Sequence, residues 1–275
     1  MLDFKLFDPS AALRDCVRSY LVIDTEKLEI PDRYTLFPTN TSALSFLAKP
    51  GILFLDDHHD KFSEASAITI TGQLTSKWTQ EFRQGGQIVT AIFSAVGMYQ
   101  LFGIYMKDLT DKVANAFDLC SKTELLNCME TILDVSPVFK KLQTLETFLL
   151  NRLRKNGQTL YGLDHIVGLI NKQKGNISIG SLPALINMSS KTFERNFDQK
   201  IGICPKMFCR ISRFSHAIKM LYQHMDIFQV IDRCGYADQA HLIKEFKSFT
   251  GNTPKQFGKT EETLVRFLID HFVEE

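Results

Sequence analysis

The chain has 275 residues, of which 44% are hydrophobic and 23% charged, and its formal net charge is +1. This length favours two domains, and this composition excludes a disordered chain or a histone-like polycation. The charge is nevertheless uneven. Residues 171–260 hold 14 Lys/Arg and 6 Asp/Glu, a net charge of +8, which is typical of a module that contacts polyanions.

Seven short apolar or β-branched runs predict strands in the first half of the chain. They cover residues 20–24, 34–37, 43–47, 52–55, 67–72, 78–82 and 88–93. Turn residues separate them, and no helical pattern follows until about residue 108. The predicted fold class is therefore α+β, with an N-terminal antiparallel β-sandwich or barrel, some helices, and an all-α C-terminal domain.

The uncharged stretch Gln84–Met106 is long enough to be weighed as a membrane span. Its glycines and its β-branched, aromatic start favour a buried strand instead. The first residues have neither a basic n-region nor an apolar h-region, so no signal peptide is expected. A cytoplasmic location with reduced thiols follows from this pattern.

Two amphipathic helical patterns come next, over 123–135 and 138–153. The second carries a stripe that includes Leu142, Leu145 and Leu149. Two interpretations are open for this stripe. It packs either on the sheet domain or against a second copy of the chain in a homodimer.

Residues 160–258 predict only helices. The expected segments are 160–173, 179–186, 189–200, 205–223, 226–233, 238–249 and 254–258. Their starts carry Ser178 or Ser181, Ser189 or Ser190, Pro205, Asp226 and Asp238. Ser and Asp accept hydrogen bonds from the first turn of a helix, and Pro suits its first position.

Two copies of a short helix, a tight turn and a longer helix lie in this region, SLPALINMSSKTFERNF and IFQVIDRCGYADQAHLIKEFK. This is the layout of a helix-turn-helix, whose second helix enters the major groove of DNA. We expect the apolar positions of both units to form packed cores. These positions are Phe193, Phe197, Ile231, Leu242 and Phe246.

The helix expected over 205–223 separates the two units. Its length would be roughly 28 Å, against about 34 Å for one turn of B-DNA. One chain can therefore hold two reading helices in successive major grooves.

Residues 160–258 resemble the AraC/XylS family of bacterial transcription regulators. The segment GYADQAHLIKEFKSFTGNTPKQF is similar to the family signature, and Ser189, Phe193, Arg195, Phe197 and Gly202 add matches in the first unit. The sequence departs from the pattern in two places. Pro183 replaces a small helix former, and Asn187-Met188 replaces the glycine of the first turn; Asn can adopt the left-handed conformation needed there.

The resemblance implies a set of DNA contacts. Base-facing positions in the first unit are Lys191, Glu194 and Arg195, and those in the second unit are Gln239, Ala240, His241 and Lys244. Their chemistry fits, because Arg and Lys suit guanine, Gln suits adenine and Glu accepts from cytosine. The expected phosphate contacts are Ser190, Thr192, Lys247, Thr253 and Lys255. The implied partners are double-stranded DNA and RNA polymerase.

The resemblance also implies a function and a division into domains. Residues 72–119 loosely resemble cupin-like N-terminal domains of these regulators. The prediction is a sequence-specific transcription regulator that responds to a small molecule, with a regulatory or dimerisation domain over 1–157. The DNA-binding domain then covers 158–275 and ends in a short acidic helix. Two alternatives are open: an enzyme or carrier in the first half with a helical tether, or a first half that only dimerises.

No metal-binding or catalytic role is expected for the remaining His, Asp and Cys residues that lie close together in the sequence. His58-His59-Asp60 is expected to be a solvated turn, and Cys204 and Cys209 are expected to be core thiols. The sequence contains no C-x-x-C zinc set, phosphate-binding loop or G-x-S-x-G motif. We therefore predict no catalytic residue, no metal and no cofactor.

The predicted strands are rich in aromatic residues, namely Phe37, Phe46, Phe54, Phe62, Trp78, Phe82 and Phe93. A sandwich or barrel can be filled by side chains or can hold one small ligand. An interior ligand would be mostly apolar, with Tyr34, Thr69 or Arg83 as candidate orienting groups. A filled aromatic core is the alternative.

Overall fold

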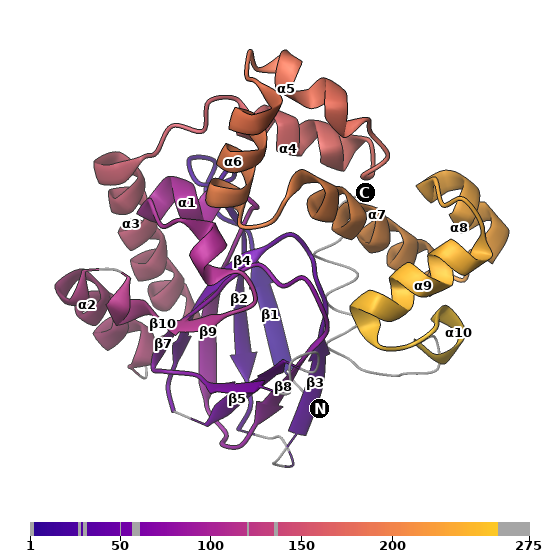
Figure 1. Ribbon diagram of the computed structural model, residues 1–275. Helices are drawn as coiled ribbons and strands as arrows, with labels where there is room; N and C mark the ends of the chain where they lie inside the picture. Colours follow the sequence, from indigo (N-terminus) through magenta and orange to yellow (C-terminus); the bar gives the residue numbers. More distant parts are fainter. Residues whose placement is uncertain are drawn as a thin grey trace.

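Figure 1 shows the computed structural model, which describes residues 3–26, 29, 32–49, 51–56, 61–119, 121–134 and 137–257. Its strands are β1 (Asp3–Phe7), β2 (Val17–Asp24), β3 (Asp32–Leu36), β4 (Ser42–Leu47), β5 (Ile52–Asp56), β6 (Lys61–Glu64), β7 (Ile68–Thr71), β8 (Trp78–Phe82), β9 (Gln87–Phe93) and β10 (Val113–Asn115). Its helices are α1 (Gly97–Phe102), α2 (Lys122–Leu133), α3 (Val138–Asn156), α4 (Leu163–Lys172), α5 (Leu182–Leu185), α6 (Ser190–Ile201), α7 (Pro205–Tyr222), α8 (Ile227–Cys234), α9 (Gln239–Thr250) and α10 (Pro254–Phe257). Short 3-10 turns are η1 (Met106–Leu109), η2 (Ala116–Asp118) and η3 (Ile179–Ser181).

The strands form two antiparallel sheets. One has the order β1-β2-β9-β4-β7-β10 and the other the order β3-β8-β5-β6. The two sheets share a core to which Leu21 and Ile88 contribute from the first and Ile52 and Phe82 from the second. The predicted antiparallel sandwich is confirmed, and the sheets are not joined into a closed barrel.

The first sheet is covered on both faces. Along β9, Ile88 and Ile92 face the second sheet, whereas Val89 and Phe93 pack in the core that includes α1, α2 and α3. A strand buried on both faces has a continuous apolar sequence rather than an alternating one, which explains the uncharged stretch around it. None of the described helices is long and apolar enough to cross a membrane.

The expectation of no helix before residue 108 was wrong. Helix α1 follows β9 at once, and its Phe102 packs edge-on against Phe93 with ring centroids 6.0 Å apart. Gly97 is required at its start because a Cβ there would lie 1.9 Å from the carbonyl oxygen of Cys16. Gly103 ends the helix with φ 69°. These flanking glycines obscured a short helical pattern.

The leucine stripe of α3 packs within the chain. Leu145 and Leu149 are fully buried in the main core, and Leu142 is partly buried against it. Of the two interpretations of the stripe, packing within the chain therefore holds for Leu145 and Leu149. A dimer interface beside them stays a prediction.

The helix starts of the C-terminal half follow the predicted capping pattern. The Ser189 hydroxyl accepts from the Thr192 amide, Asp226 caps α8, and Asp238 caps α9 through the His241 amide at 2.7 Å. Pro205 is the first residue of α7. Side-chain oxygens that accept from first-turn amides stabilise a helix by about 1 kcal/mol each.

The first unit contains the two departures from the family pattern, and both are accommodated. Ser178 and Ser181 stand at N-cap positions without a side-chain cap bond, and Pro183 is the second residue of α5, where it displaces no helical hydrogen bond. Asn187 has φ 53°, the left-handed conformation expected of it.

The two halves of the chain share one continuous core. The predicted domain boundary at 157/158 falls between the end of α3 and the start of α4 and stays a prediction. Polar contacts also cross the junction: Lys107 of η1 pairs with Asp198 of α6, and Thr110 donates to the Gly202 carbonyl. The predicted acidic C-terminal helix lies outside the described residues.

Candidate DNA interface and sandwich cavity

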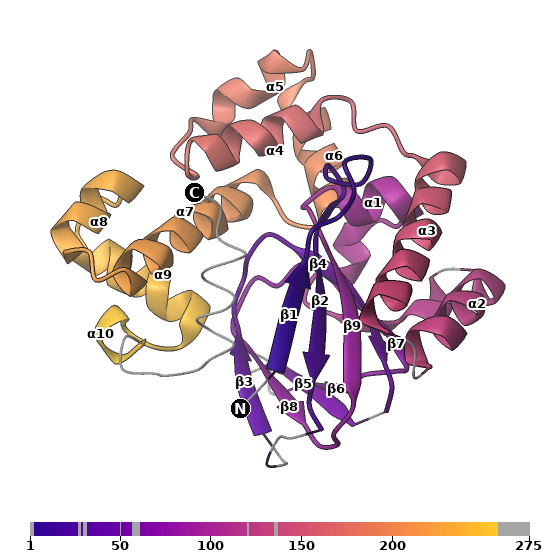
Figure 2. The same cartoon turned by 180° about the vertical axis from the view of Figure 1, so that it is seen from behind.

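Helix α7 separates the two helix-turn-helix units. It has 18 residues and is therefore about 27 Å long. Figures 1 and 2 show α6 beside one end of α7 and the α8–α9 pair along its other half. This is the arrangement expected from the sequence.

The first reading helix, α6, presents a polar face to solvent. Lys191, Glu194 and Arg195 are exposed, whereas Phe193 and Phe197 are buried with ring centroids 5.6 Å apart. The buried rings fix the rotation of the helix about its axis. The three residues expected to face base edges therefore project outward together.

The second reading helix, α9, is built in the same way, with Leu242 and Phe246 buried and Gln239, Ala240 and Lys244 exposed.

His241 of α9 is held in one orientation. The His241 Nδ1 atom accepts a hydrogen bond from the Ala237 amide at 3.4 Å, and the ring lies edge-on to Tyr236. With Nδ1 as an acceptor, the hydrogen of the neutral ring lies on Nε2. That atom can donate to guanine or thymine oxygen in a major groove.

The residues expected to contact phosphate fall into two groups. Ser190, Lys247 and Lys255 are exposed. The hydroxyls of the two threonines serve in helix caps: Thr192 accepts from Ser189 at 3.0 Å, and Thr253 donates to Gln256 at 2.9 Å. Phosphate contact by any of these residues stays a prediction.

Some basic side chains of this module are structural. Arg210 Nε donates to the buried carboxylate of Glu245 at 2.8 Å, which ties α7 to α9. Lys200 is buried, donates to the Thr159 carbonyl at 3.1 Å and lies over the Tyr161 ring. Burial also lowers the pKa of Lys200. The net charge of this segment therefore overstates what faces DNA.

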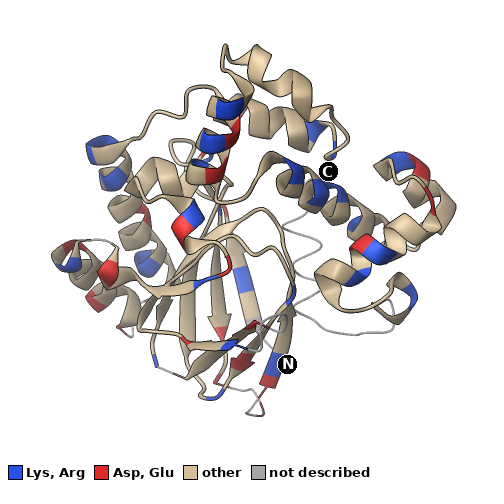
Figure 3. Ribbon diagram, in the orientation of Figure 1, with Lys and Arg blue, Asp and Glu red and all other residues tan. Residues whose placement is uncertain are grey.

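One basic residue was missed by the sequence reasoning. Lys206, in the first turn of α7, is exposed and lines a shallow depression together with Lys191 and Arg195 of α6. Figure 3 shows Lys and Arg along α6, α7 and α9. Because Lys206 belongs to the helix after the reading helix, only the fold could bring it to this surface.

The expected solvated turn at His58-His59-Asp60 and the two expected core thiols, Cys204 and Cys209, can be compared with the structure. Among the described residues, no group of three His, Cys, Asp or Glu could hold a metal ion, and the segment His58-His59-Asp60 lies outside them. Cys209 is buried as expected, and burial raises the pKa of its thiol to about 11. The expectation for Cys204 was wrong, because it is exposed at the N-cap of α7.

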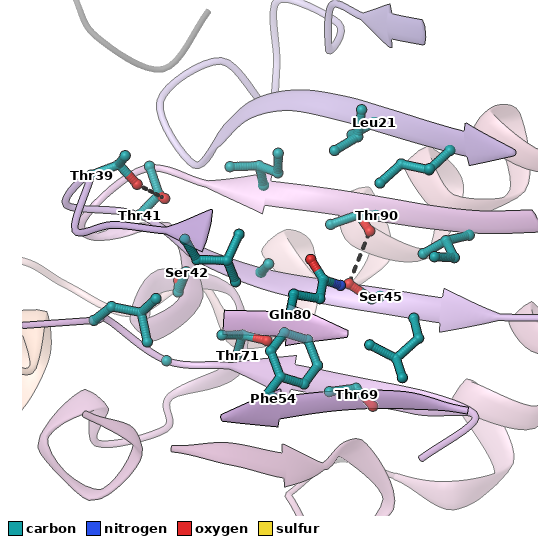
Figure 4. A pocket seen from close by; sticks show the side chains of 18 of the residues that line it. Leu21, Thr39, Thr41, Ser42, Ser45, Phe54, Thr69, Thr71, Gln80 and Thr90 are labelled. Carbon is teal, nitrogen blue, oxygen red and sulfur yellow. Dashed lines mark hydrogen bonds between the residues drawn. The ribbon is translucent and has the colours of Figure 1, made fainter. Parts of the chain in front are cut away.

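A cavity of about 150 Å³ lies between the two sheets (Figure 4). Of the aromatic rings expected in the strands, Phe37 and Phe54 line it. Thr69 also lines it, as expected, but Tyr34 and Arg83 do not. Tyr34 donates to Asp32, and Arg83 pairs with Glu81. Hydrogen bonds from Arg83 and Arg33 hold the pKa of Glu81 below its usual range.

Both halves of the chain are similar to known protein families. A family model described as a helix-turn-helix domain matches residues 183–260, and one described as a domain of unknown function (DUF6597) matches residues 5–115. An uncharacterised helix-turn-helix transcriptional regulator of Haemophilus influenzae is 28% identical over 96 residues, which are 34% of this chain and 32% of the relative. The chain thus spans about a third of the length of that relative.

Solved structures of ToxT from Vibrio cholerae are similar over most of the chain. An apo variant is 13% identical with a TM-score of 0.48, covering 86% of this chain and 96% of that one. A form with a bound unsaturated fatty acid is 13% identical with a TM-score of 0.47, covering 88% and 96%.

The helix-turn-helix match covers both units that α7 separates, with their capped reading helices and buried phenylalanine cores. Residues 183–260 therefore form an AraC-type helix-turn-helix domain, as the resemblance of this segment to the AraC/XylS family predicts.

Proposed function

We propose that this protein is a sequence-specific DNA-binding transcription regulator. The observation that carries the proposal is the pair of reading helices, α6 and α9, whose buried cores turn Lys191, Arg195 and Gln239 outward at the two ends of one rigid helix. Arg and Lys read guanine and Gln reads adenine in the major groove. The base and phosphate contacts named from the sequence form part of this proposal.

The proposal includes a regulatory first half over residues 1–157. The cavity between the sheets supports a small-molecule effector, because it is the kind of mostly apolar, concave space that ligands occupy. We propose that this half senses and does not catalyse. RNA polymerase and a second copy of the chain are the further partners that we propose, and the cytoplasm, where a bacterial regulator meets its DNA, is the proposed location.

The experiment is selection of binding sites from random duplex DNA by the purified full chain, followed by titration. The expected result is one enriched sequence that binds at least about 10³-fold more tightly than unrelated DNA. A double variant, Arg195→Ala with Gln239→Ala, should lose the enrichment and keep the fold. Recovery of unenriched DNA by the wild-type chain would refute the proposal.

A further inference from the structure

We propose that the cavity between the sheets takes an uncharged, compact, mostly apolar molecule that carries one or two hydrogen-bonding groups. This inference rests on the proposed function, since it names the class of effector that the first half would sense. Its support comes from the chemistry of the cavity wall, from the unused hydrogen-bonding groups in it, and from its volume.

The wall contains no ionisable side chain among the described residues that form it. Aliphatic side chains dominate it, contributed by Leu21, Ile23, Leu36, Leu47, Ile52, Leu74, Ile88 and Ile92. An ionised carboxylate, phosphate or ammonium buried here would have no opposite charge and would lose its hydration, which disfavours binding strongly. A charged group held against this wall is therefore strongly disfavoured on physical grounds.

The polar groups of the wall are hydroxyls and one amide. The hydroxyls of Ser45 and Thr90 bond to each other at 2.9 Å (Figure 4). Thr69 donates to the Ser66 carbonyl at 2.8 Å. In the described part of the chain, the side-chain amide of Gln80 has no hydrogen-bond partner. An amide both donates and accepts, so Gln80 suits a ligand hydroxyl or carbonyl.

The volume sets the size of the ligand. The cavity measures about 150 Å³, and an apolar protein cavity of that volume takes up benzene. A single ring with a small substituent therefore fits. A disaccharide, a nucleotide or a long acyl chain exceeds this space.

The test compares probes of equal size and different charge on the full chain at pH 7.5. Benzyl alcohol, phenol and toluene are the neutral probes, and benzoate and benzylamine are the charged ones. We expect the neutral probes to raise the unfolding midpoint by about 5 °C at saturation and the charged ones to leave it unchanged. Equal or tighter binding of benzoate or benzylamine would overturn the inference, as would failure of every neutral probe to bind.

Two variants localise the binding. Ala43→Leu fills the cavity from β4 and should abolish the shift by the neutral probes; Thr71→Ile serves the same purpose if Ala43→Leu does not fold. Ala67→Leu, at an exposed position before β7, is the matched control and should respond like the wild type. Unchanged binding by a folded cavity-filling variant would place the ligand elsewhere and overturn the inference.

A third variant tests the polar contact. Gln80→Leu should weaken benzyl alcohol about tenfold and leave toluene unaffected, because only the alcohol loses a hydrogen bond. Equal weakening of both probes would show that Gln80 does not bind the ligand hydroxyl.

Selection of DNA-binding sites runs in parallel on the same preparation. If the selection succeeds while the neutral probes fail to bind, only the inference about the cavity is wrong. If the selection fails while the probes bind, the proposed DNA-binding function is wrong.

Discussion

The ring of Phe37 touches both the sandwich cavity and the helix that separates the two DNA-reading units. It lines the cavity, and it meets the ring of Phe214 of α7 edge-on, with centroids 5.8 Å apart. Close by, Asn40 donates to the Ser212 hydroxyl at 2.9 Å. The cavity wall and α7 are thus in direct contact. A ligand that changes the position of Phe37 changes the packing of α7.

Phe37→Leu should separate ligand binding from the DNA response. The smaller side chain keeps an apolar wall but loses the edge-on contact with Phe214, so a neutral ligand still stabilises the protein while DNA affinity no longer changes on its addition. Phe46→Leu is the control, because Phe46 is buried in the core on the other face of the sheet. The measurements are unfolding midpoints and fluorescence anisotropy with and without ligand. A full DNA response in Phe37→Leu would show that the coupling runs elsewhere.

Arg195→Ala and Gln239→Ala should each cost about 1–3 kcal/mol of DNA-binding free energy and relax preference at one base pair. Lys255→Ala should weaken all sequences alike, as expected for a phosphate contact. Anisotropy with the selected site and its single-base-pair variants measures both effects. Lys122→Ala, at an exposed position in the first turn of α2, is the control and should bind like the wild type. Unchanged preference in both reading-helix variants would contradict the assignment.

DNA binding should depend steeply on salt. Six exposed basic side chains lie on this module's α6, α7, α9 and α10, namely Lys191, Arg195, Lys206, Lys244, Lys247 and Lys255. If all six side chains neutralise phosphates, the affinity for DNA should fall about 10³-fold when the salt concentration rises from 50 to 200 mM. Lys206→Ala should lower the slope of log affinity against log salt by about one. An unaltered slope would show that this residue does not reach the backbone.

Leu145→Glu should unfold the protein, because Leu145 is fully buried and a carboxylate there has no partner, at a cost of about 3 kcal/mol or more. Phe139→Glu, on the same helix but 75% exposed, should keep the unfolding midpoint of the wild type. Circular dichroism and gel filtration distinguish the outcomes. A folded, monomeric Leu145→Glu obtained from a dimeric wild type would restore the interface interpretation.

Acid should destabilise the protein through His216. Burial, followed by the positive charges of Lys174, Lys219 and Arg18, lowers the pKa of His216 to about 4, against about 6.5 in an unfolded chain. The unfolded state therefore binds the proton more readily. The free energy of unfolding is therefore at its full value above pH 6.5 as far as His216 is concerned. It decreases by on the order of 1–3 kcal/mol as the pH falls towards 4. His216→Gln should flatten urea-unfolding stability across this range, and the exposed His165→Gln should not.

The elements of the fold could be predicted wherever sequence period and burial agree. All seven predicted strands are present, because each is buried on at least one face. Three strands escaped prediction, namely β1, β6 and β10. Two have weak patterns, since β6 is KFSE and largely exposed and β10 has three residues. The third, β1, has the alternating sequence DFKLF, which the sequence reasoning missed. The strand order could not be predicted, since β9 pairs with β2 and β4, which are distant in sequence.

The candidate site could be predicted from caps and core phenylalanines, because these fix where a reading helix starts and which face it buries. Which basic side chains face DNA could not be predicted from the sequence. Arg210 and Lys200 contribute to the net charge counted for residues 171–260, but they serve the packing of α7 and α6. The cavity also escaped prediction in detail, since the two candidates Tyr34 and Arg83 pair with neighbouring acids instead.

The two reading helices on α7 differ in sequence, so a bound chain has a head and a tail. If the proposed base contacts hold, one bound chain covers a non-palindromic sequence in one orientation only. The first half of the chain contacts the first unit through Lys107 and Asp198 and the second unit through Phe37 and Phe257, so its direction on DNA is fixed by the direction of the bound chain. Inverting the site in a promoter would turn the bound chain around, so that the end of the chain that had pointed towards the transcription start would point away from it.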